Sequence, residues 1–402
     1  MGLLPFEDAR ARILEIVRTL DVSPGTESIP LRCAAGRVLA SAVRADRDYP
    51  PFNRSARDGF ACRAEDLRTV PARLRVIGET RAGEPSRFAL GRGETVEIMT
   101  GAPGPRNADC VVMVEHSRRD GDYVVLETSL APGRNLVAKG SEGALGASVL
   151  GAGACIDYPS IALLASVGAA EVEVYRKPRV AILSTGDEIV ELDRAPEDFQ
   201  IRNSNAHSLA AQVERRGGEA VMLPVAADEL EATRRLILEG LEADMLLLSG
   251  GVSMGKYDLV EQVLTELDAE IAITAVAIQP GKPLVFGTCR GKPVFGLPGN
   301  PISTMVTFEV FARSAMELAA GRPEAALPFT KARLAHDFTH NPALTRFLPA
   351  RLSGDYGDAS VERIHWQGSG DLVSASRANC YLVAERGREA WAAGDPIDVL
   401  PL

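Results

Sequence analysis

Apolar runs and amphipathic stretches alternate regularly between residues 177 and 326, and this alternation constrains the fold more than any other sequence feature. Residues 179–183 and 245–248 have the length and composition of buried strands, whereas residues 204–216 and 302–320 have helical spacing. Further strands are expected at 220–225, 271–278, 284–287 and 294–297, and further helices at 228–241 and 259–267. Such alternation implies parallel strands joined by right-handed crossovers, which predicts a doubly wound α/β domain.

Four loops of this domain follow predicted strands, at residues 184–188, 249–255, 279–283 and 298–303. In a doubly wound sheet, ligands bind beyond the carboxyl ends of the strands. These loops are rich in Gly, Ser, Thr and Pro, and backbone N–H groups and hydroxyls gathered at one edge suit phosphates, although each loop could also be a tight connection. We therefore expect a binding cleft formed by Ser184, Thr185, Gly186, Ser249, Gly250, Gly251, Ser253, Pro298, Gly299, Asn300 and Ser303.

The loop after residue 248 has the clearest local pattern. Gly250 and Gly251 follow Ser249, and adjacent glycines allow backbone conformations and close ligand approach that a Cβ would block. A helix comes next, so that free backbone N–H groups and the helix dipole point at the same spot. This strand–turn–helix pattern predicts an anion-binding turn.

Three carboxylates lie among these loops, at Asp187, Glu188 and Asp258. A magnesium ion is commonly held by one or two carboxylates together with phosphate oxygens of the substrate. The three residues are therefore candidate Mg²⁺ ligands. Asp258 has an alternative role as a helix cap, because Glu261 completes a capping box with it.

Two further polar features accompany the loops. Lys282 lies between Gly281 and Pro283, which would hold its ammonium group at the end of a strand; the alternative is a solvated loop lysine. Asp228 and Glu231 have the spacing of a capping box at the start of the helix expected at 228–241.

The rest of the chain divides around the α/β domain. An amphipathic helix is expected at 6–20, and a helix at 159–168, ended by Gly168, is expected to pack on it. Short strands separated by Gly and Pro between 70 and 150 indicate a β-domain inserted between these helices, and short strands also indicate a β-domain at the C-terminus. The predicted domains are residues 1–48 with 150–176 (helical and linker), 49–149 (inserted β), 177–326 (α/β) and 327–402 (C-terminal β, with strands at 332–334, 381–383 and 397–400).

Composition and missing motifs argue against several functions. The net charge of −10 disfavours nonspecific binding to nucleic acid or an anionic membrane. The six cysteines form no C-x-x-C pair, and no secretion signal or apolar run of about 18 residues occurs, so a cytoplasmic protein without membrane spans is expected. Walker A, Gly-x-Gly-x-x-Gly and Gly-x-Ser-x-Gly motifs are absent, and His336 and His340 lack a third metal ligand.

Several short segments, taken together, are similar to those of a known family. In chain order they are Ser55-Ala56-Arg57-Asp58-Gly59-Phe60-Ala61, Ile98-Met99-Thr100-Gly101-Ala102-Pro103, Ser184-Thr185-Gly186-Asp187-Glu188, Ser249-Gly250-Gly251-Val252-Ser253-Met254-Gly255 with Asp258, Pro280-Gly281-Lys282-Pro283, Leu297-Pro298-Gly299-Asn300-Pro301, Gln367-Gly368-Ser369 and Ala378-Asn379-Cys380. The set resembles the molybdopterin molybdenumtransferases, the MoeA family, which includes the gephyrin E domain. The resemblance extends from about Phe6 to Pro401.

This resemblance implies a fold and a reaction. It implies a multidomain α/β protein with a MogA-like, doubly wound pterin-binding domain, an N-terminal helical domain carrying an inserted β-domain, and a C-terminal β-domain. It also implies an elongated homodimer whose cleft lies between the α/β domain of one subunit and the inserted β-domain of the other. The implied reaction converts adenylylated molybdopterin and molybdate to molybdenum cofactor and AMP, with Mg²⁺. Molybdoenzymes or other proteins of the cofactor pathway would be further partners.

The resemblance also assigns roles to individual residues. Its catalytic group is Asp58, Thr100, Glu188, Asp258 and Lys282, of which Asp58 and Thr100 would reach the partner's cleft. Molybdate would be bound by Lys282 with Ser303, Arg346 and Ser369, and Mg²⁺ by Asp187, Glu188 and Asp258.

The chain departs from the family pattern at several of these sites. Gln279 stands where the family commonly has Lys, and Asn203 stands where it has Asp. Residues 137–142, including Ser141, lack an Arg and an acidic group of the family motif. Arg54 and Arg57 flank Asp58 and would either supply the missing positive charge or engage Asp58 in a salt bridge. A catalytically altered paralogue that carries molybdopterin or binds a partner is therefore the alternative to an active transferase.

Overall fold

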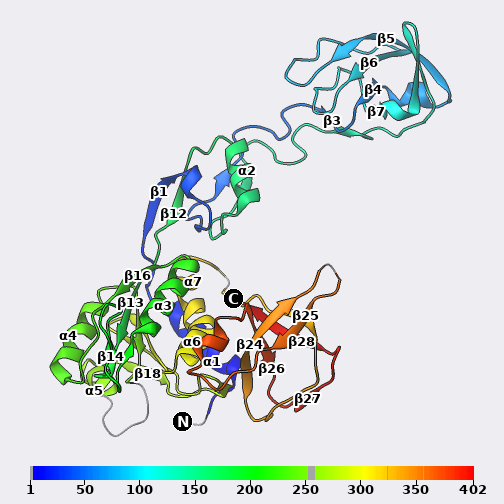
Figure 1. Cartoon of the computed structure of the whole chain (residues 1–402). Helices are drawn as coiled ribbons and strands as arrows, with labels where there is room; N and C mark the ends of the chain where they lie inside the picture. The colour runs from blue at the N-terminus through cyan, green and yellow to red at the C-terminus, as the bar shows by residue number, and fades with distance from the viewer. Residues whose placement is uncertain (1–2, 252–258, 324, 356) are drawn as a thin grey trace.

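The computed structural model describes residues 3–251, 259–323, 325–355 and 357–402. The molecule is elongated, with an α/β part and a C-terminal β part side by side, a small linker part above them, and the inserted β-domain at the far end (Figure 1). The predicted fold class is confirmed. None of the helices in the described residues is long and apolar enough to cross a membrane.

The central sheet has six strands in the order β16-β13-β17-β21-β20-β18. The first four, β16 (Glu219–Met222), β13 (Arg179–Ser184), β17 (Met245–Ser249) and β21 (Lys292–Leu297), are parallel. The last two, β20 (Val285–Cys289) and β18 (Glu270–Ile273), are antiparallel to their neighbours. The parallel pairing expected from the sequence holds for the first four strands but not for β20, because Arg290 and Gly291, both at positive φ, connect β20 to β21 as a hairpin.

The helices of this part lie near their predicted positions. They are α3 (Ser204–Arg215), α4 (Leu230–Gly240), α5 (Leu259–Glu266), and α6 (Pro301–Thr307) continued by a π-helical turn (Phe308–Ala312) and α7 (Arg313–Ala319). The capping box expected at Asp228 was wrong: α4 begins two residues later, with Glu229 at its N-cap and no side-chain cap. The N–H of Asp228 instead takes Asp187 Oδ1 as its acceptor, at 3.0 Å.

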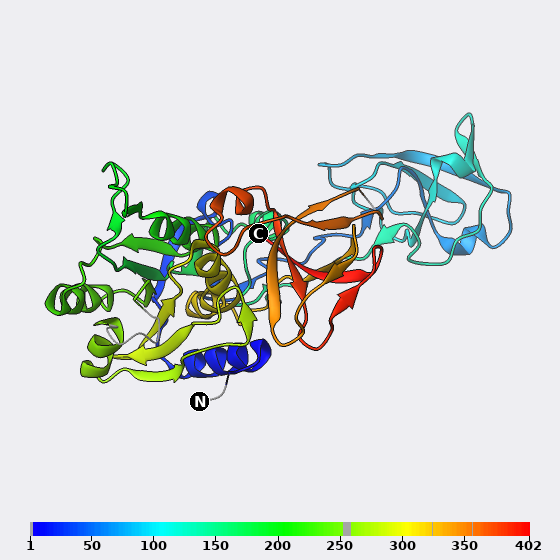
Figure 2. The same cartoon turned by 60° about the horizontal axis from the view of Figure 1, so that its bottom comes forward.

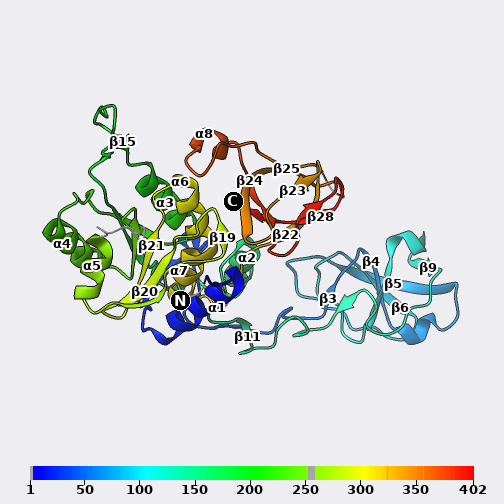
Figure 3. The same cartoon turned by 90° about the horizontal axis from the view of Figure 1, so that it is seen from below.

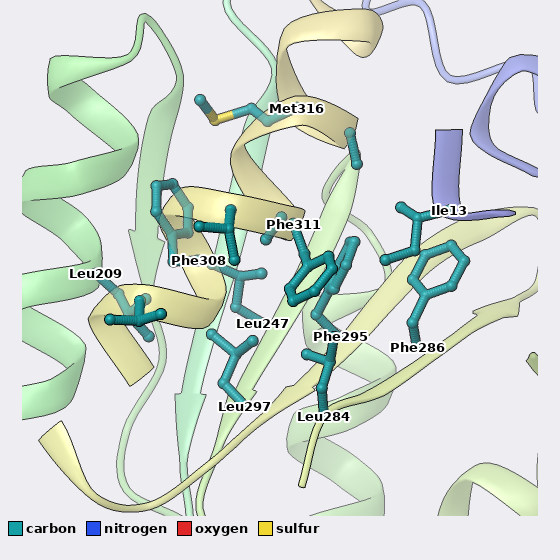
Figure 4. Packing of buried hydrophobic residues seen from close by; sticks show 14 of the residues in the cluster. Ile13, Leu209, Leu247, Leu284, Phe286, Phe295, Leu297, Phe308, Phe311 and Met316 are labelled. Atoms are coloured by element: carbon teal, nitrogen blue, oxygen red, sulfur yellow. The ribbon is translucent and has the colours of Figure 1, made fainter. Parts of the chain in front are cut away.

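The N-terminal helix α1 (Phe6–Thr19) belongs to the central core. The sequence led us to expect that it packs on α2 (Tyr158–Ser166), and this expectation was wrong. Its buried face includes Ile13, which lies beside Phe286 in Figure 4, while Figure 2 shows the whole helix lying along the central part. The Phe6 ring makes edge-on contacts with Phe311 and Phe347, at centroid distances of 5.6 and 5.2 Å. Packing against these aromatic rings buries more apolar area of α1 than packing against α2 would, because the single buried residue of α2 is Leu164.

A small linker part joins the core to the inserted domain. In it, β1 (Thr26–Pro30) pairs with β12 (Glu171–Tyr175), and α2 packs over them around Leu39 and Ile156. Two short pairs lead outward from it, β2 (Val43–Arg44) with β11 (Ser148–Leu150) and β3 (Arg54–Ser55) with β10 (Leu136–Val137).

The inserted domain is a six-stranded sheet in the order β7-β4-β6-β5-β9-β8. Gly59, the first residue of β4, lets two strands approach closely, because a Cβ there would lie 1.9 Å from the Val112 carbonyl oxygen. The strands are β4 (Gly59–Cys62), β5 (Ala72–Thr80), β6 (Glu94–Ile98), β7 (Cys110–Met113), β8 (Ser117–Asp120) and β9 (Tyr123–Leu126).

The C-terminal part is a sheet closed by pairing between β24 and β26, with strand order β19-β24-β25-β22-β28-β26. Its first strand, β19 (Ile278–Gln279), comes from the central region, so the strand expected at 271–278 is in fact split between two sheets. The predicted C-terminal strands are confirmed within β22 (Thr330–Leu334), β26 (Cys380–Ala384) and β28 (Pro396–Pro401), beside β24 (Thr345–Ser353), β25 (Ser360–Arg363) and the short helix α8 (Leu372–Ala375).

Candidate functional site

A cleft of about 900 Å³ opens at the carboxyl ends of β13, β17 and β21. These ends are level, because Ser184 pairs with Ser249 and Ser249 with Leu297 in the sheet register. The cleft is lined by Ser184, Thr185, Gly186, Glu188, Ile189, Ile201, Arg202, Asn203, Ser204, Asn205, Asp228, Ser249, Gly250, Gly251, Leu259, Pro283, Pro298, Gly299, Asn300 and Pro301. Ten of the predicted site residues are therefore brought together here.

The Gly250–Gly251 turn fits tightly against the neighbouring loop. Both residues have positive φ, of 88° and 63°. A Cβ on Gly250 would lie 2.9 Å from the Thr185 carbonyl oxygen, and one on Gly251 would lie 2.7 Å from Thr185 Oγ1. Only glycine meets both demands, so the turn is fixed by packing as well as by its backbone conformation.

Asn205, in the first turn of α3, connects two walls of the cleft. Its Nδ2 donates to Ser249 Oγ at 2.9 Å and to the Gly299 carbonyl oxygen at 2.8 Å. Sequence reasoning missed this residue because it follows no strand directly. The available signal was a pair of Asn residues at the start of a helix that begins beside the predicted strand ends.

The carboxylates of the cleft differ from the predicted set. Glu188 lines it, as does Asp228, which the sequence suggested only as a helix cap. Asp187 does not line it, because its Oδ1 accepts the N–H of Asp228 and thereby joins two loops. Within the described residues, no three His, Cys, Asp or Glu side chains form a group that could hold a metal alone. Asp258 and Ser253 lie outside the described residues.

The residues expected to bind an oxyanion are divided between the β19–β24 edge of the C-terminal sheet, helix α6 and the segment before α8. Gln279 of β19 is the register partner of Arg346 on β24, and the Ser369 carbonyl oxygen accepts the N–H of Ile302, next to Ser303 in α6. Lys282 is exposed on the loop that reaches the cleft through Pro283. None of Lys282, Ser303, Arg346 and Ser369 lines the cleft itself.

Arg346 is the most desolvated cation of this edge. Its Nε is buried without a hydrogen-bond partner among the described residues. Burial lowers the pKa of its guanidinium, and the positive charge of Arg363 lowers it further. Since no acidic residue among the described contacts pairs with Arg346, its guanidinium is a candidate for binding an anion.

Asp58 and Thr100 meet in the inserted domain. The backbone N–H and the hydroxyl of Thr100 donate to Asp58 Oδ1 at 2.6 and 2.8 Å. These two bonds, the backbone one first, lower the pKa of Asp58. Both residues are exposed, and their domain lies away from the cleft of their own chain (Figure 3).

The two added arginines do not engage Asp58. Arg54 pairs with Glu142 at 2.8 Å, Arg57 is exposed, and Asp58 forms an ion pair with no residue that the structure describes. The salt bridge suggested from the sequence is therefore not formed, and the Asp58 carboxylate keeps its second oxygen for another partner.

The fold and the cleft define a multidomain α/β protein with a cleft lined by glycines and hydroxyl side chains at the carboxyl edge of its central sheet. Models of known families match nearly the whole chain: "MoeA N-terminal region (domain I and II)" at residues 4–168, "Probable molybdopterin binding domain" at 181–318 and "MoeA C-terminal region (domain IV)" at 331–402. The chain thus belongs to the MoeA family of molybdopterin molybdenumtransferases, which are enzymes of molybdenum cofactor biosynthesis.

Individual relatives agree with this assignment. A molybdopterin molybdenumtransferase of Nostoc sp. is 35% identical over 97% of this chain and 92% of its own length, and one of Staphylococcus aureus is 32% identical over 99% and 95%. A molybdopterin biosynthesis MoeA protein from Pyrococcus horikoshii OT3 has a similar structure, with a TM-score of 0.79, 29% identity and complete coverage of both chains.

Proposed function

We propose that this chain inserts molybdenum from molybdate into adenylylated molybdopterin and releases AMP. The observation that carries the proposal is the cleft in which three loops of backbone N–H groups and hydroxyls face two carboxylates, Glu188 and Asp228. The names of the relatives support a molybdopterin substrate.

The loops of the cleft would hold the two linked phosphates of this substrate. Ser184 and Ser249 present hydroxyls, and the Gly250–Gly251 turn leaves its backbone open to close approach. Asn205 keeps the loops of β17 and β21 at a fixed distance, so little reorganisation is needed when the ligand binds. The chemistry then requires stabilisation of negative charge as a phosphoanhydride P–O bond breaks.

The donor set of the cleft fits Mg²⁺. Two carboxylates and the phosphate oxygens of a substrate are the kind of ligands that this ion takes, and no complete protein cage is required. Glu188 and Asp228 would hold the ion, with Asp187 fixing the backbone of Asp228. Bound Mg²⁺ would supply charge neutralisation at the phosphates.

Molybdate would bind at the edge formed by Arg346, Ser303, Ser369 and Lys282. Arg346 is desolvated and lacks an acidic neighbour among its described contacts, and Lys282 extends from the loop that borders the cleft. Gln279, beside Arg346 in the register, would donate a hydrogen bond in place of a charge.

A homodimer would bring Asp58 and Thr100 to a cleft. In one chain these residues belong to the inserted domain, which lies apart from the α/β part (Figure 1), and two short hydrogen bonds already orient them. A second copy that presents its inserted domain would complete the site with a carboxylate.

The neutral residues Gln279 and Asn203 favour a second candidate, a paralogue that binds molybdopterin without transferring molybdenum. The deciding experiment measures AMP release from adenylylated molybdopterin with Mg²⁺, with and without molybdate. Molybdate-dependent release supports the transferase. Ligand binding without such release would support the carrier, and appearance of activity in Gln279→Lys would locate the cause.

A further inference from the structure

Arg57 lies in the short bend between β3 and β4, next to Asp58, and it is exposed. On one side its backbone is held by Ser55, whose buried hydroxyl donates to the Arg57 carbonyl oxygen at 2.6 Å. On the other side Thr100 binds the Asp58 carboxylate, and the N–H of Val114 donates to the Asp58 carbonyl oxygen at 3.1 Å. The bend is therefore anchored at both ends, while the Arg57 side chain extends into solvent.

The Arg57 guanidinium has no partner among the residues that the structure describes. Arg54 differs, because it pairs with Glu142 at 2.8 Å, so of the two arginines beside Asp58 only Arg57 is left unpaired. By itself an exposed arginine is an ordinary solvated side chain. Arg57 is distinguished by its neighbour Asp58, which the proposed function brings to the cleft of a second chain.

The cleft itself has little positive charge for an anionic ligand. Of the described residues that line it, Glu188 and Asp228 are acidic and Arg202 alone is basic. Lys282 and Arg346 stand outside the lining. A ligand with two linked phosphates carries a negative charge on each, and a guanidinium matches a phosphate with paired hydrogen bonds. A further cation would balance such a ligand, and no described residue of the lining supplies it.

We propose that Arg57 supplies this cation to the cleft of a second copy of the chain, where its guanidinium binds an oxyanion of the ligand. This inference rests on the proposed function, which brings Asp58 to the same cleft. Neighbouring Cα atoms are about 3.8 Å apart, so the surface that receives the Asp58 carboxylate also lies within reach of the longer Arg57 side chain. The oxyanion is either a phosphate of the nucleotide or molybdate, since both present several oxygens to a guanidinium.

Calorimetric titration of the full-length protein, with AMP and Mg²⁺ and separately with molybdate, tests the role of the charge. We expect Arg57→Met, which keeps an unbranched side chain without its charge, to weaken binding of one anion by about tenfold. Weaker binding of AMP identifies the phosphate, and weaker binding of molybdate identifies molybdate. Arg57→Lys keeps the charge but not the paired hydrogen bonds, so its loss should be smaller.

The matched control is Arg92→Met. Arg92 is also exposed and has no ion pair among the described residues. It precedes β6, at the end of that strand opposite Thr100, so it lies away from Asp58. Its substitution should leave the affinity for both anions unchanged.

Mixing variants shows which chain provides the arginine. In mixed dimers of Arg57→Met with Glu188→Gln, the intact cleft faces an intact Arg57 from the other chain. With losses of rate of about tenfold and 100-fold in the separate variants, AMP release by the mixture should reach about a quarter of the wild-type rate. If Arg57 served the cleft of its own chain, the mixture would reach only about a twentieth, and the inference would be overturned.

Two other results would overturn the inference and leave the transferase intact. One is an affinity of Arg57→Met for both anions equal to that of the wild type or of a weakened Arg92→Met. The other is a loss that analytical ultracentrifugation traces to dissociation of the dimer. A wild-type protein without molybdate-dependent AMP release would instead overturn the proposed function, and the inference with it.

Discussion

The cleft of the central sheet and the Asp58–Thr100 pair of the inserted domain are organised in opposite ways. In the cleft, Ser184, Thr185 and Ser249 are buried, and neighbouring loops are joined through Asn205. Asp58 and Thr100 are bound to each other but stand exposed just outside the ends of β4 and β6. The cleft therefore has walls of its own, whereas the distal pair is oriented without any, and under the proposed function it would act on a ligand held by a second chain.

The largest effect is expected when the distal pair is inactivated in one chain and the cleft in another. Asp58→Asn and Glu188→Gln should each lower the rate of AMP release by about 100-fold, because Glu188 would hold the Mg²⁺ that neutralises the phosphates and Asp58 would complete the site from the partner chain. When the two inactive proteins are mixed and allowed to exchange subunits, half of the dimers are mixed and each has one intact site. Activity should then return to about a quarter of the wild-type value.

The control for this complementation is a mixture of Asp58→Asn with Asp58→Asn,Glu188→Gln, in which no site can be intact. An absence of recovery in the first mixture, with subunit exchange verified by mass spectrometry, would contradict the assignment of the two regions to one shared site.

A smaller effect is expected from the turn that shapes the cleft. Gly250→Ala places a Cβ 2.9 Å from the Thr185 carbonyl oxygen at a φ of 88°. Gly83 also has a φ of 88°, but nothing lies within 4 Å of its Cβ position. Gly83→Ala should cost about 1 kcal/mol of unfolding free energy from backbone strain, and Gly250→Ala about 2–3 kcal/mol because the clash is added. Denaturant unfolding measures both, and equal losses would show that packing against Thr185 does not constrain the turn.

The elements that could be predicted from the sequence are those whose position depends on the residue pattern of a short segment. The strand ends and the glycine turn were predictable because a doubly wound sheet always presents these loops at one edge, and the loops carry the residues that such a site requires. The antiparallel β20 was not, since its direction depends on a two-residue connection at Arg290 and Gly291 within an otherwise regular alternation.

Placement of α1 and Asn205 required the tertiary structure. The amphipathic pattern of α1 predicts a buried face but not its partner, and that partner includes Phe311 and Phe347, which lie some 300 residues later in the chain. Asn205 acts through two loops that meet only when β17 and β21 pair, so spacing along the chain gives no indication of it.

The link made by Asn205 can be tested against another amide on the same helix. Asn205→Ala removes two hydrogen bonds in the cleft, while Gln212→Ala removes one, from Nε2 to the Met305 carbonyl oxygen, outside it. Both should lower the unfolding free energy, by roughly 1–2 and 1 kcal/mol respectively. Only Asn205→Ala should weaken AMP binding, and comparable loss of binding in Gln212→Ala would indicate a general effect of helix stability.

The smallest expected effect concerns the distal pair alone. Thr100→Val keeps the β-branched shape but removes the hydroxyl that donates to Asp58, while the backbone N–H still donates. The pKa of Asp58 should therefore rise toward the usual value for Asp and remain below it, since the backbone bond is the larger cause of the lowering. Because the pKa of Asp58 is lowered by folding, its bonds to Thr100 stabilise the protein above the unfolded-state pKa, and this stability is lost as pH falls through the folded-state pKa. In the variant, whose folded-state pKa is higher, the loss should be complete at a higher pH. Carbon-13 NMR titration of the Asp58 carboxyl measures the change, with Thr80→Val as the control, because the buried hydroxyl of Thr80 has no partner in the described structure.

A pKa of Asp58 that stays fixed in Thr100→Val, or moves equally in Thr80→Val, would mean that the orientation of Asp58 does not depend on the Thr100 hydroxyl.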